Sequence, residues 1–296
     1  MVITSVSNPK IKELIALNDK KVMRETRTFI VEGINIVKDI PPSVKILKYV
    51  AVCGIPLAPL SVREGVEIIT VSENVFARLS RVKNPQGVAA VAEIPEGRID
   101  DGQNALILDR VRDPGNVGTL LRSAAAFGFF NAVLIDCADA CSQKVLRSSM
   151  GGVFKLNVIE ADEKDIFNFL HREKYRFFGL DADGEDIKNI SEFKDGAGGK
   201  AALREVENIS EFKSEVCNKS RKAALAGSKN ISEFKDERGS GEKKTALIVG
   251  NEADGISNFL RGACDGILSI GMSGEMESLN AAVAGSIAMH LFFSKD

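Results

Sequence analysis

The chain has 296 residues and a mass of 31.9 kDa, with 39 Lys and Arg residues against 41 Asp and Glu residues. A hydrophobic fraction of 44% with 27% charged residues is typical of globular proteins and excludes a wholly disordered or fibrous chain. The most apolar stretch, residues 281–293, is interrupted by Ser286 and His290 and is shorter than the roughly 20 residues of a membrane span, so no membrane segment is expected.

The cysteines and histidines argue against several kinds of site. Five scattered cysteines without a Cys-x-x-Cys pair predict neither structural zinc nor a disulfide framework. His171 and His290 are far apart and lack a metal-type neighbour, which disfavours metal hydrolysis and His-based triads. The first residues lack a basic flank followed by an apolar block, so we expect no secretory signal and a cytoplasmic location.

Residues 1–97 are predicted to form a small α/β domain, because short apolar runs alternate with polar helical segments. The runs are 29–31, 46–53, 66–71 and 88–92. Residues 1–50 carry nine Lys and Arg against five Asp and Glu, a net charge of +4 that is compatible with a phosphate-rich partner and equally with a solvated surface. With no Trp and two Tyr, recognition of RNA by serial base stacking is not favoured.

A second domain is predicted over residues 104–296, after a linker rich in turn-forming and charged residues at 95–104. Short, fully apolar runs separated by helical segments are typical of a parallel sheet buried on both faces. The predicted strands are 105–109, 132–136, 177–180, 245–249 and 266–270. The expected fold class is therefore α/β with a mostly parallel sheet.

The helix after the first of these strands can be predicted in detail. Pro114-Gly115 predicts a turn, Asn116 suits an N-cap, and Gly128 is placed to end the helix. Arg122 falls outside the apolar stripe and is free to face a ligand. The stripe has the i, i+3, i+4, i+7 spacing of a buried helix face and consists of Val117, Leu120, Leu121 and Ala124.

A polar repeat interrupts the second domain. The hexapeptide Asn-Ile-Ser-Glu-Phe-Lys begins at Asn189, Asn208 and Asn230, and only the third copy leads into a convincing strand. Two extra copies are too few for a solenoid, which needs about three stacked units. We interpret 189–229 as a surface insertion; a dedicated docking arm is the alternative.

Three loops follow strand ends and carry the polar residues that chemistry needs. They are 110–116, 250–255 and 271–280. In open α/β sheets, ligands bind at the carboxyl ends of the strands. Each loop alone is also explicable as turn chemistry, and Ser278 could merely cap the last helix.

Taken together and in this order, the loops resemble the motifs of the SPOUT superfamily, specifically the SpoU/TrmH-type RNA 2′-O-ribose methyltransferases. The matching segments are 113–128, 248–257 and 270–284, with 142–154 similar to the family's helix after the second strand. Segments 3–40 and 86–91 are similar to the small RNA substrate-binding domain often fused to this family. Gly271 departs from the proline common at that position, and the repeat has no family counterpart.

The resemblance implies a trefoil-knotted fold, a homodimer and S-adenosylmethionine as the cofactor, with no metal. Residues at the family's cofactor-binding positions are Gly250, Ile270, Met272 and Leu279. Residues at the positions around the methyl group and the incoming ribose are Asn116, Arg122, Glu252, Ser278 and Asn280.

The physical roles of several of these residues remain open at the level of sequence. Because a guanidinium has a pKa above about 12, we interpret Arg122 as a phosphate clamp that stabilises the developing alkoxide rather than as a general base. Asn280 either orients the cofactor or third loop, or caps the last helix. Glu252 can brace the loops through Asn116, and Arg147 can contact RNA phosphate or a partner subunit.

The sequence therefore predicts a cytoplasmic enzyme that methylates a ribose 2′-hydroxyl in RNA, not DNA. Ribosomal RNA is preferred over tRNA because the extra N-terminal domain resembles ribosome-associated readers. A non-catalytic RNA-binding or ribosome-assembly protein of the same fold is the alternative from another class. Methylation of a base rather than a ribose is a third possibility that the motifs disfavour.

Overall fold

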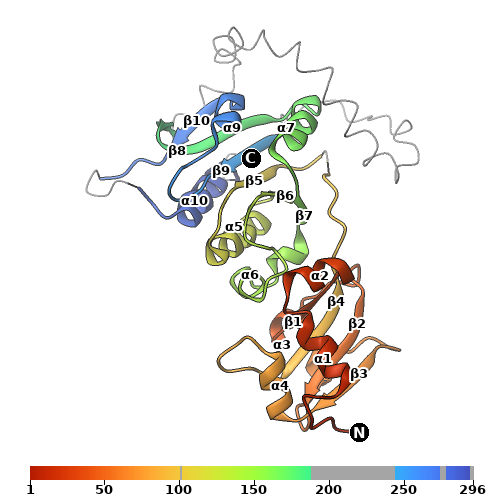
Figure 1. Cartoon of the computed structure of the whole chain (residues 1–296). Coiled ribbons are helices and arrows are strands. Elements are labelled where there is room, and N and C mark those ends of the chain that lie inside the picture. Colours follow the sequence, from red (N-terminus) through yellow and green to blue (C-terminus); the bar gives the residue numbers. More distant parts are fainter. Residues whose placement is uncertain (101, 188–243, 274–277, 294–296) are drawn as a thin grey trace, which may run out of the picture.

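The computed structural model describes residues 1–100, 102–187, 244–273 and 278–293, and the predicted insertion at 189–229 lies outside these residues (Figure 1). Two sheets follow one another along the chain. We call residues 1–93 the N-terminal region and residues 105–293 the C-terminal region. In the described residues, no helix is long and apolar enough to cross a membrane.

The N-terminal region contains a four-stranded sheet in the order β1-β4-β2-β3, in which only β2 and β3 pair in parallel. All four predicted apolar runs are strands. They are β1 (Thr28–Glu32), β2 (Ile46–Val52), β3 (Glu67–Val71) and β4 (Val88–Glu93). The helical segments are α1 (Pro9–Ala16), α2 (Lys20–Thr26), α3 (Ile34–Lys38), η1 (Ala58–Leu60) and α4 (Glu73–Leu79).

The C-terminal region contains a six-stranded, wholly parallel sheet in the order β10-β8-β9-β5-β6-β7. Its strands are β5 (Ala105–Asp109), β6 (Asn131–Ile135), β7 (Asn157–Glu160), β8 (Arg176–Asp186), β9 (Thr245–Val249) and β10 (Gly266–Ser269). Its helical segments are α5 (Pro114–Ala126), α6 (Gln143–Ser148), η2 (Gly152–Lys155), α7 (Glu163–Arg172), α9 (Asn258–Ala263) and α10 (Ala281–Phe293).

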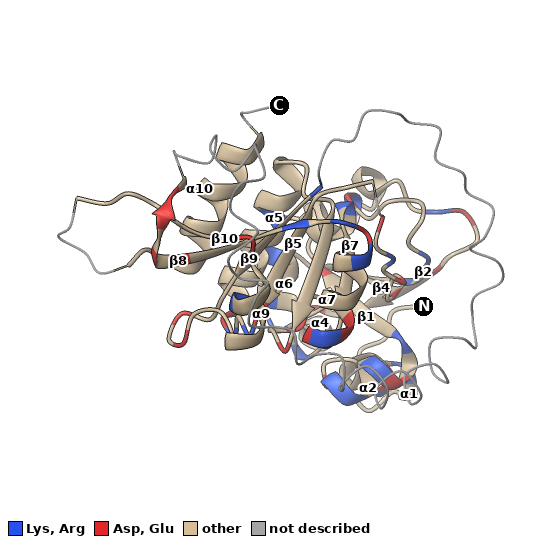
Figure 2. Ribbon diagram, turned by 90° about the horizontal axis from the view of Figure 1, so that it is seen from above, with Lys and Arg blue, Asp and Glu red and all other residues tan. Residues whose placement is uncertain are grey.

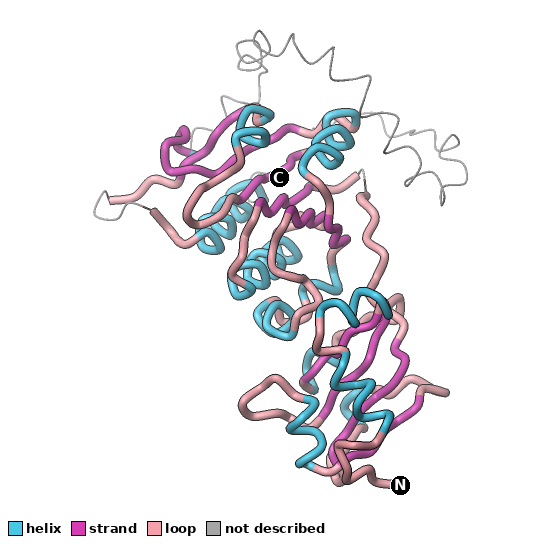
Figure 3. Tube along the Cα trace, viewed as in Figure 1, coloured by secondary structure: helices cyan, strands magenta, loops and turns pink. Residues whose placement is uncertain are grey.

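Helices cover both faces of this sheet (Figure 3). Because side chains alternate along a strand, Leu106 and Leu108 pack in the cluster with α5 and α10, whereas Ala105 and Ile107 pack in the cluster with α7 and α9. The predicted α/β class with a parallel sheet is therefore confirmed. The trefoil knot stays a prediction.

The sequence predicted five of the six strands and missed β7. Its residues, Asn-Val-Ile-Glu, are only half-buried because β7 is an edge strand, so they lack the continuous apolar run on which the prediction relied. β8 continues to Asp186, well past the predicted end at 180, because parallel pairing with β10 resumes at Glu185 after a register shift.

Helix α5 begins earlier than the sequence suggested. Asp113, not Asn116, is the N-cap, because its side chain accepts the backbone N–H of Asn116 at 2.9 Å and Pro114 occupies the first helical position. The predicted stripe from Val117 to Ala124 is fully buried. The helix ends at Ala126, and Gly128 follows with a φ of +77°, as predicted for its end.

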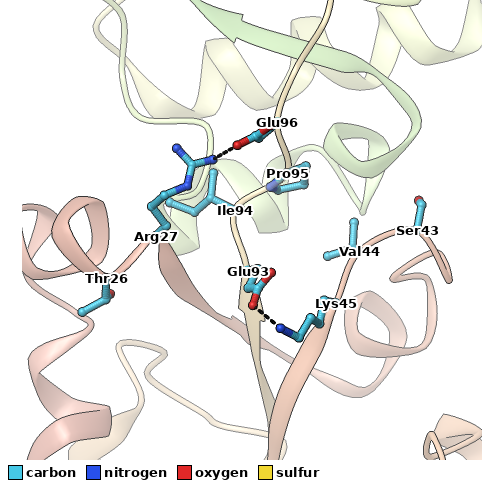
Figure 4. A pocket seen from close by; sticks show the side chains of 9 residues that line it. All are labelled: Thr26, Arg27, Ser43, Val44, Lys45, Glu93, Ile94, Pro95 and Glu96. Atoms are coloured by element: carbon cyan, nitrogen blue, oxygen red, sulfur yellow. Dashed lines mark hydrogen bonds and ion pairs between the residues drawn. The ribbon is translucent and has the colours of Figure 1, made fainter. Parts of the chain in front are cut away.

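A connection at residues 94–104 joins the two sheets and borders a cleft (Figure 4). A cavity of about 870 Å³ lies between this connection, the α2–β1 segment and the η2–β7 segment. A neighbouring cavity of about 440 Å³ is bordered by two exposed ion pairs, Arg27 with Glu96 at 3.6 Å and Lys45 with Glu93 at 2.6 Å. Both cavities lie away from the three predicted site loops.

Candidate active site

The three predicted site loops leave the carboxyl ends of β5, β9 and β10. Because all strands of this sheet are parallel, these ends lie at one edge of the sheet. α5 then starts at Pro114 and α10 at Ala281, and the two helices pack through Ser123 and Ser286, whose hydroxyl oxygens are 2.7 Å apart. This packing brings the first turns of both helices to the same edge.

A chain of two side-chain hydrogen bonds connects the loops. Nδ2 of Asn280 donates to Oδ1 of Asn116 at 3.1 Å, and Nδ2 of Asn116 donates to Oε1 of Glu252 at 2.5 Å. The amide of Asn116 is thereby fixed with its oxygen toward Asn280 and its nitrogen toward Glu252. Three residues predicted for the site are therefore brought into one cluster, which includes the Glu252–Asn116 brace anticipated from the sequence.

Asn280 also caps α10. Its Oδ1 accepts the backbone N–H groups of Ala282 at 2.9 Å and Val283 at 3.3 Å. The alternative of a cap at Ser278 is wrong, since the helix begins at Ala281, directly after Asn280. Asn280 thus combines the capping and loop-orienting roles that the sequence left as alternatives, one through each atom of its amide.

Asn251 shapes the second loop, and the sequence analysis missed it. Its Oδ1 accepts the N–H of Ala253 at 2.7 Å, and its Nδ2 donates to the carbonyl of Arg110 at 2.9 Å. Its backbone pairs with that of Gly255 in both directions. Asn after a strand-ending Gly is a turn signal because its side chain readily bonds nearby backbone, so the sequence held this information.

Asp109 is the second residue that was missed. Its carboxylate is buried, accepts the N–H of Ser257 at 2.6 Å and pairs with Arg110 at 2.9 Å. The hydrogen bond from Arg110 to this carboxylate raises the pKa of the guanidinium. The sequence did hold a signal for this residue, because Asp109 is a carboxylate at the end of an otherwise apolar strand. The two contacts of Asp109 thus connect the first loop to the residue that follows the second loop.

The first turn of α5 carries an ordered carboxylate. The pKa of Asp113 lies below its ordinary value. The larger cause is the hydrogen bond from the N–H of Asn116, and the second is Lys144, whose Nζ is 3.2 Å away. Asp113 is consequently ionised at neutral pH and caps α5 with a full negative charge, which is favourable at a helix N-terminus. Lys144 lies on α6, so this pair also connects the site to the neighbouring helix.

Arg122 is not part of the cluster formed by Asn116, Glu252 and Asn280. It is exposed on α5, and its guanidinium forms no hydrogen bond or ion pair within the described part of the chain. Six helical positions from Asn116 correspond to a rotation of about 240°, so the two side chains leave different faces of α5. The backbone of Arg122 instead lies against Gly152. A Cβ added to Gly152 would be 3.1 Å from the Cα of Arg122.

The predicted cofactor-binding residues differ in exposure. Gly250 is buried and Ile270 is half-buried, whereas Met272 and Leu279 are exposed at 39% and 36%. Packing also requires glycine at position 250, because a Cβ there would lie 2.3 Å from the carbonyl carbon of Gly255. Ser278 is exposed beside Leu279.

This set of groups fits a ligand with an apolar ring and a positive charge. Met272 and Leu279 offer exposed apolar surface for a ring, and the exposed carboxylate of Glu252 favours a nearby cation. Both are properties of S-adenosylmethionine, which carries an adenine ring and a sulfonium. In the described residues, no group of three His, Cys, Asp or Glu side chains is placed to hold a metal ion.

Comparisons with known proteins identify relatives along nearly the whole chain. The 23S rRNA (guanosine(2553)-2'-O)-methyltransferase RlmP of Bacillus subtilis is 29% identical over 289 residues, 97% of each chain. A 23S rRNA (adenosine(1067)-2'-O)-methyltransferase of Streptomyces laurentii is 22% identical over 98% of this chain and 94% of the relative. The crystal structure of an AdoMet-bound rRNA methyltransferase from Sinorhizobium meliloti matches with a TM-score of 0.73 at 25% identity, covering 98% of this chain and 96% of the other.

Two family models match the chain. The MRM3-like substrate binding domain matches residues 8–90. The SpoU rRNA Methylase family matches residues 103–203 and 190–290, which overlap in the repeated segment and together span more than half of the chain. As the resemblance of its motifs predicted, the chain belongs to the SpoU rRNA methylase family.

Proposed function

We propose that this protein transfers the methyl group of S-adenosylmethionine to a ribose 2′-hydroxyl of ribosomal RNA. The observation that carries the proposal is the cluster of Asn116, Glu252 and Asn280 at the carboxyl edge of a SpoU-type sheet. Family membership supports the reaction. The two relatives named for 23S rRNA 2′-O-methylation, which match nearly the whole chain, support the substrate.

The chemistry needs alignment more than it needs reactive side chains. S-adenosylmethionine supplies a methyl group on a cationic sulfonium that an oxygen nucleophile displaces in line. Holding the reactants close and aligned supplies much of the acceleration. Gly250, Ile270, Met272 and Leu279 would hold the cofactor, and Glu252 would favour its positive charge. Asn116 and Asn280 fix the geometry of the loops around it.

Arg122 is proposed to bind the RNA phosphate next to the reacting ribose. A guanidinium binds phosphate through two parallel N–H donors and stays protonated at neutral pH. It would stabilise the alkoxide that develops as the 2′-hydroxyl loses its proton, and the proton would leave to water or to a neighbouring group. Ser278, exposed in the same loop as Asn280, is proposed to contact the ribose.

A homodimer would bring Arg122 to the cluster. Within one chain, Arg122 leaves α5 on a different face from Asn116. α10 contains no Lys, Arg, Asp or Glu, yet Val283 is 47% exposed and Phe293 is 54% exposed. A helix without charge is normally covered, and a second copy packed on α10 and α5 would cover it.

The two regions are proposed to divide the work. Residues 1–97 would recognise the RNA, supported by the match to a substrate-binding domain, and residues 104–296 would carry out methyl transfer. Ribosomal RNA is preferred over tRNA because the relatives that span the chain are named for it. An enzyme with this substrate works where ribosomal RNA is found, which in a bacterium such as B. subtilis is the cytoplasm.

The proposal is tested by supplying S-adenosylmethionine with a radiolabelled methyl group together with unmodified transcripts of large-subunit ribosomal RNA or of tRNA. We expect label in the ribosomal transcript. Label in tRNA alone would reassign the substrate. Titration of the protein with S-adenosylmethionine in a calorimeter separates an enzyme from a non-catalytic RNA-binding protein, for which no heat of binding is expected.

A further inference from the structure

Strand β1 and helix α6 lie side by side across the junction between the two regions. Nε2 of Gln143 donates to the carbonyl of Ile30 at 2.7 Å, which occupies an acceptor on the open edge of the N-terminal sheet. Two residues further along β1 is Glu32, and four residues further along α6 is Arg147. These steps are both about 6 Å long, so Arg147 lies near Glu32. Burial raises the pKa of Glu32, and the hydroxyl of Ser80 and the charge of Arg147 lower it by less.

Glu32 anchors the segment that joins α4 to β4. The residue is only 4% exposed, and Oε1 accepts the hydroxyl of Ser80 at 2.6 Å. At the other end of the segment, Oε1 of Gln86 accepts the N–H of Ile34 at 2.8 Å. Residues 80–87 are therefore fixed at both ends to the chain around and just after the end of β1.

The two sides of the junction differ in charge. Residues 78–87 carry three Lys and Arg residues, residues 142–150 carry two, and neither segment has a carboxylate. Lys83 and Arg147 are exposed, and neither forms an ion pair within the described part of the chain. At the cleft beside residues 94–104, in contrast, three cations are paired with carboxylates. The pairs there are Arg24–Glu160, Arg27–Glu96 and Lys45–Glu93.

The side that carries Lys83 and Arg147 leads to the candidate active site. Lys144 lies one turn before Arg147 on α6, and its Nζ is 3.2 Å from the carboxylate of Asp113, which caps the helix that carries Asn116. In Figure 1, the connection from α4 to β4 and the described residues that follow β10 lie on the same side of the molecule. Lys83 and Arg147 thus mark a route from the N-terminal region toward the site, and Lys144, whose charge is paired with Asp113, connects α6 to it.

We propose that Lys83 and Arg147 bind phosphates of the substrate RNA between the part recognised by the N-terminal region and the methylated ribose. Glu32 is a positioning residue that holds residues 80–87 and faces Arg147. This inference rests on the proposed function in one respect, that the partner is RNA. Lys and Arg contacts to phosphate give affinity without sequence preference and make binding depend on salt.

The test measures binding of an unmodified large-subunit ribosomal RNA transcript between 50 and 200 mM salt, concentrations over which counterion release is readily resolved. Arg147→Ala and Lys83→Ala should each weaken binding roughly three- to ten-fold and lower the slope of log K against log salt by about 0.7–0.9. The double variant should lose about twice that slope. Lys45→Ala, a cation paired with Glu93 on the other side, is the matched control and should change neither quantity.

Weaker binding with an unchanged salt slope, or an equal effect of Lys45→Ala, would overturn the phosphate contacts. Because binding is measured without methyl transfer, a wild-type protein that binds the transcript but transfers no methyl group would contradict the proposed reaction and leave this surface supported. Calorimetry with S-adenosylmethionine should give the same affinity for all variants, and a loss in Arg147→Ala would show that the site itself had been damaged.

The role of Glu32 is tested by comparing Glu32→Ala with Glu32→Gln. The alanine variant loses the acceptor for Ser80, so KM for RNA should rise roughly three- to ten-fold while kcat is unchanged, and the glutamine variant should recover most of the loss. A merely structural role would instead lower kcat together with the thermal midpoint, with no recovery in KM for the glutamine variant.

Discussion

Asn280 and Asn116 are 164 positions apart in the chain, yet their side chains form a hydrogen bond of 3.1 Å between the first turns of α10 and α5. The bond works because the other atom of each amide is also used: Oδ1 of Asn280 caps α10, and Nδ2 of Asn116 donates to Glu252. The cluster is consequently held in one orientation by the starts of two helices and a tight turn.

Asn280→Asp separates the two functions of this side chain. The carboxylate keeps the cap, so the free energy of unfolding should change by less than about 0.5 kcal/mol. The donor to Asn116 is lost and a negative charge is added beside Glu252, so methyl transfer should fall about ten-fold or more. Asn280→Ala loses both functions and should also cost about 1 kcal/mol of stability in chemical denaturation. Full activity of Asn280→Asp would show that only the cap matters.

Arg122→Ala should lower turnover by roughly 10²–10³, the scale for removing a group that stabilises developing charge. The affinity for S-adenosylmethionine, measured by calorimetry, should be little changed. An equal fall in cofactor affinity would refute the role as a phosphate clamp.

Mixing two impaired variants tests whether Arg122 acts across a dimer. When Arg122→Ala and Asn280→Ala chains exchange freely, half of the dimers are mixed and one of their two sites is intact, so about a quarter of wild-type activity should return. Neither variant alone should regain activity on incubation. An inactive mixture, with subunit exchange verified by mass spectrometry, would place Arg122 in the same chain as the cluster it serves.

Gly118 permits the close packing of α5 against α6. A Cβ at this position would lie 1.9 Å from Oγ of Ser148 and 2.8 Å from the carbonyl of Val145. Gly118→Ala should therefore lower the free energy of unfolding by roughly 1–3 kcal/mol. Thr119→Ala, at the next and exposed position of the same helix, is the control and should change it by less than about 0.5 kcal/mol. Equal stability of the two variants would contradict the close approach.

Glu32 predicts a pH dependence of stability. Burial raises its pKa above the ordinary value of 4.5, more than Ser80 and Arg147 lower it. The folded state is then favoured when Glu32 is protonated, and this contribution is lost as the pH rises through the raised pKa. Relative to Glu32→Gln, the wild type should lose stability as the pH rises above 4.5, and the loss should be larger when Arg147 is replaced by alanine. A gain in stability with pH would contradict the burial.

The sequence was informative wherever local pattern and tertiary environment agree. The buried stripe of α5, the apolar strands β5 and β9 and the terminating Gly128 all follow from periodicity or turn chemistry. β7 was missed because an edge strand needs no continuous apolar run. The cap of α5 was misplaced because Asp113 and Asn116 are both good N-cap residues, and only the hydrogen bond distinguishes them.

The candidate site, like the fold, could be predicted from the sequence only in part. Motifs indicated which loops matter, and the parallel sheet explains why they meet. No local pattern could show that Asn280 uses both atoms of its amide or that Glu32 lies near Arg147 across the junction. These relationships depend on contacts between distant segments, which a single sequence does not contain.

The most direct measurement is the chemical position of the transferred methyl group. After reaction of unmodified large-subunit ribosomal RNA with radiolabelled S-adenosylmethionine, the RNA is hydrolysed in alkali, which cannot cleave a linkage next to a 2′-O-methyl ribose. Transfer to the ribose predicts that the label is recovered in alkali-stable dinucleotides. Label in mononucleotides, the product of base methylation, would contradict the proposed reaction.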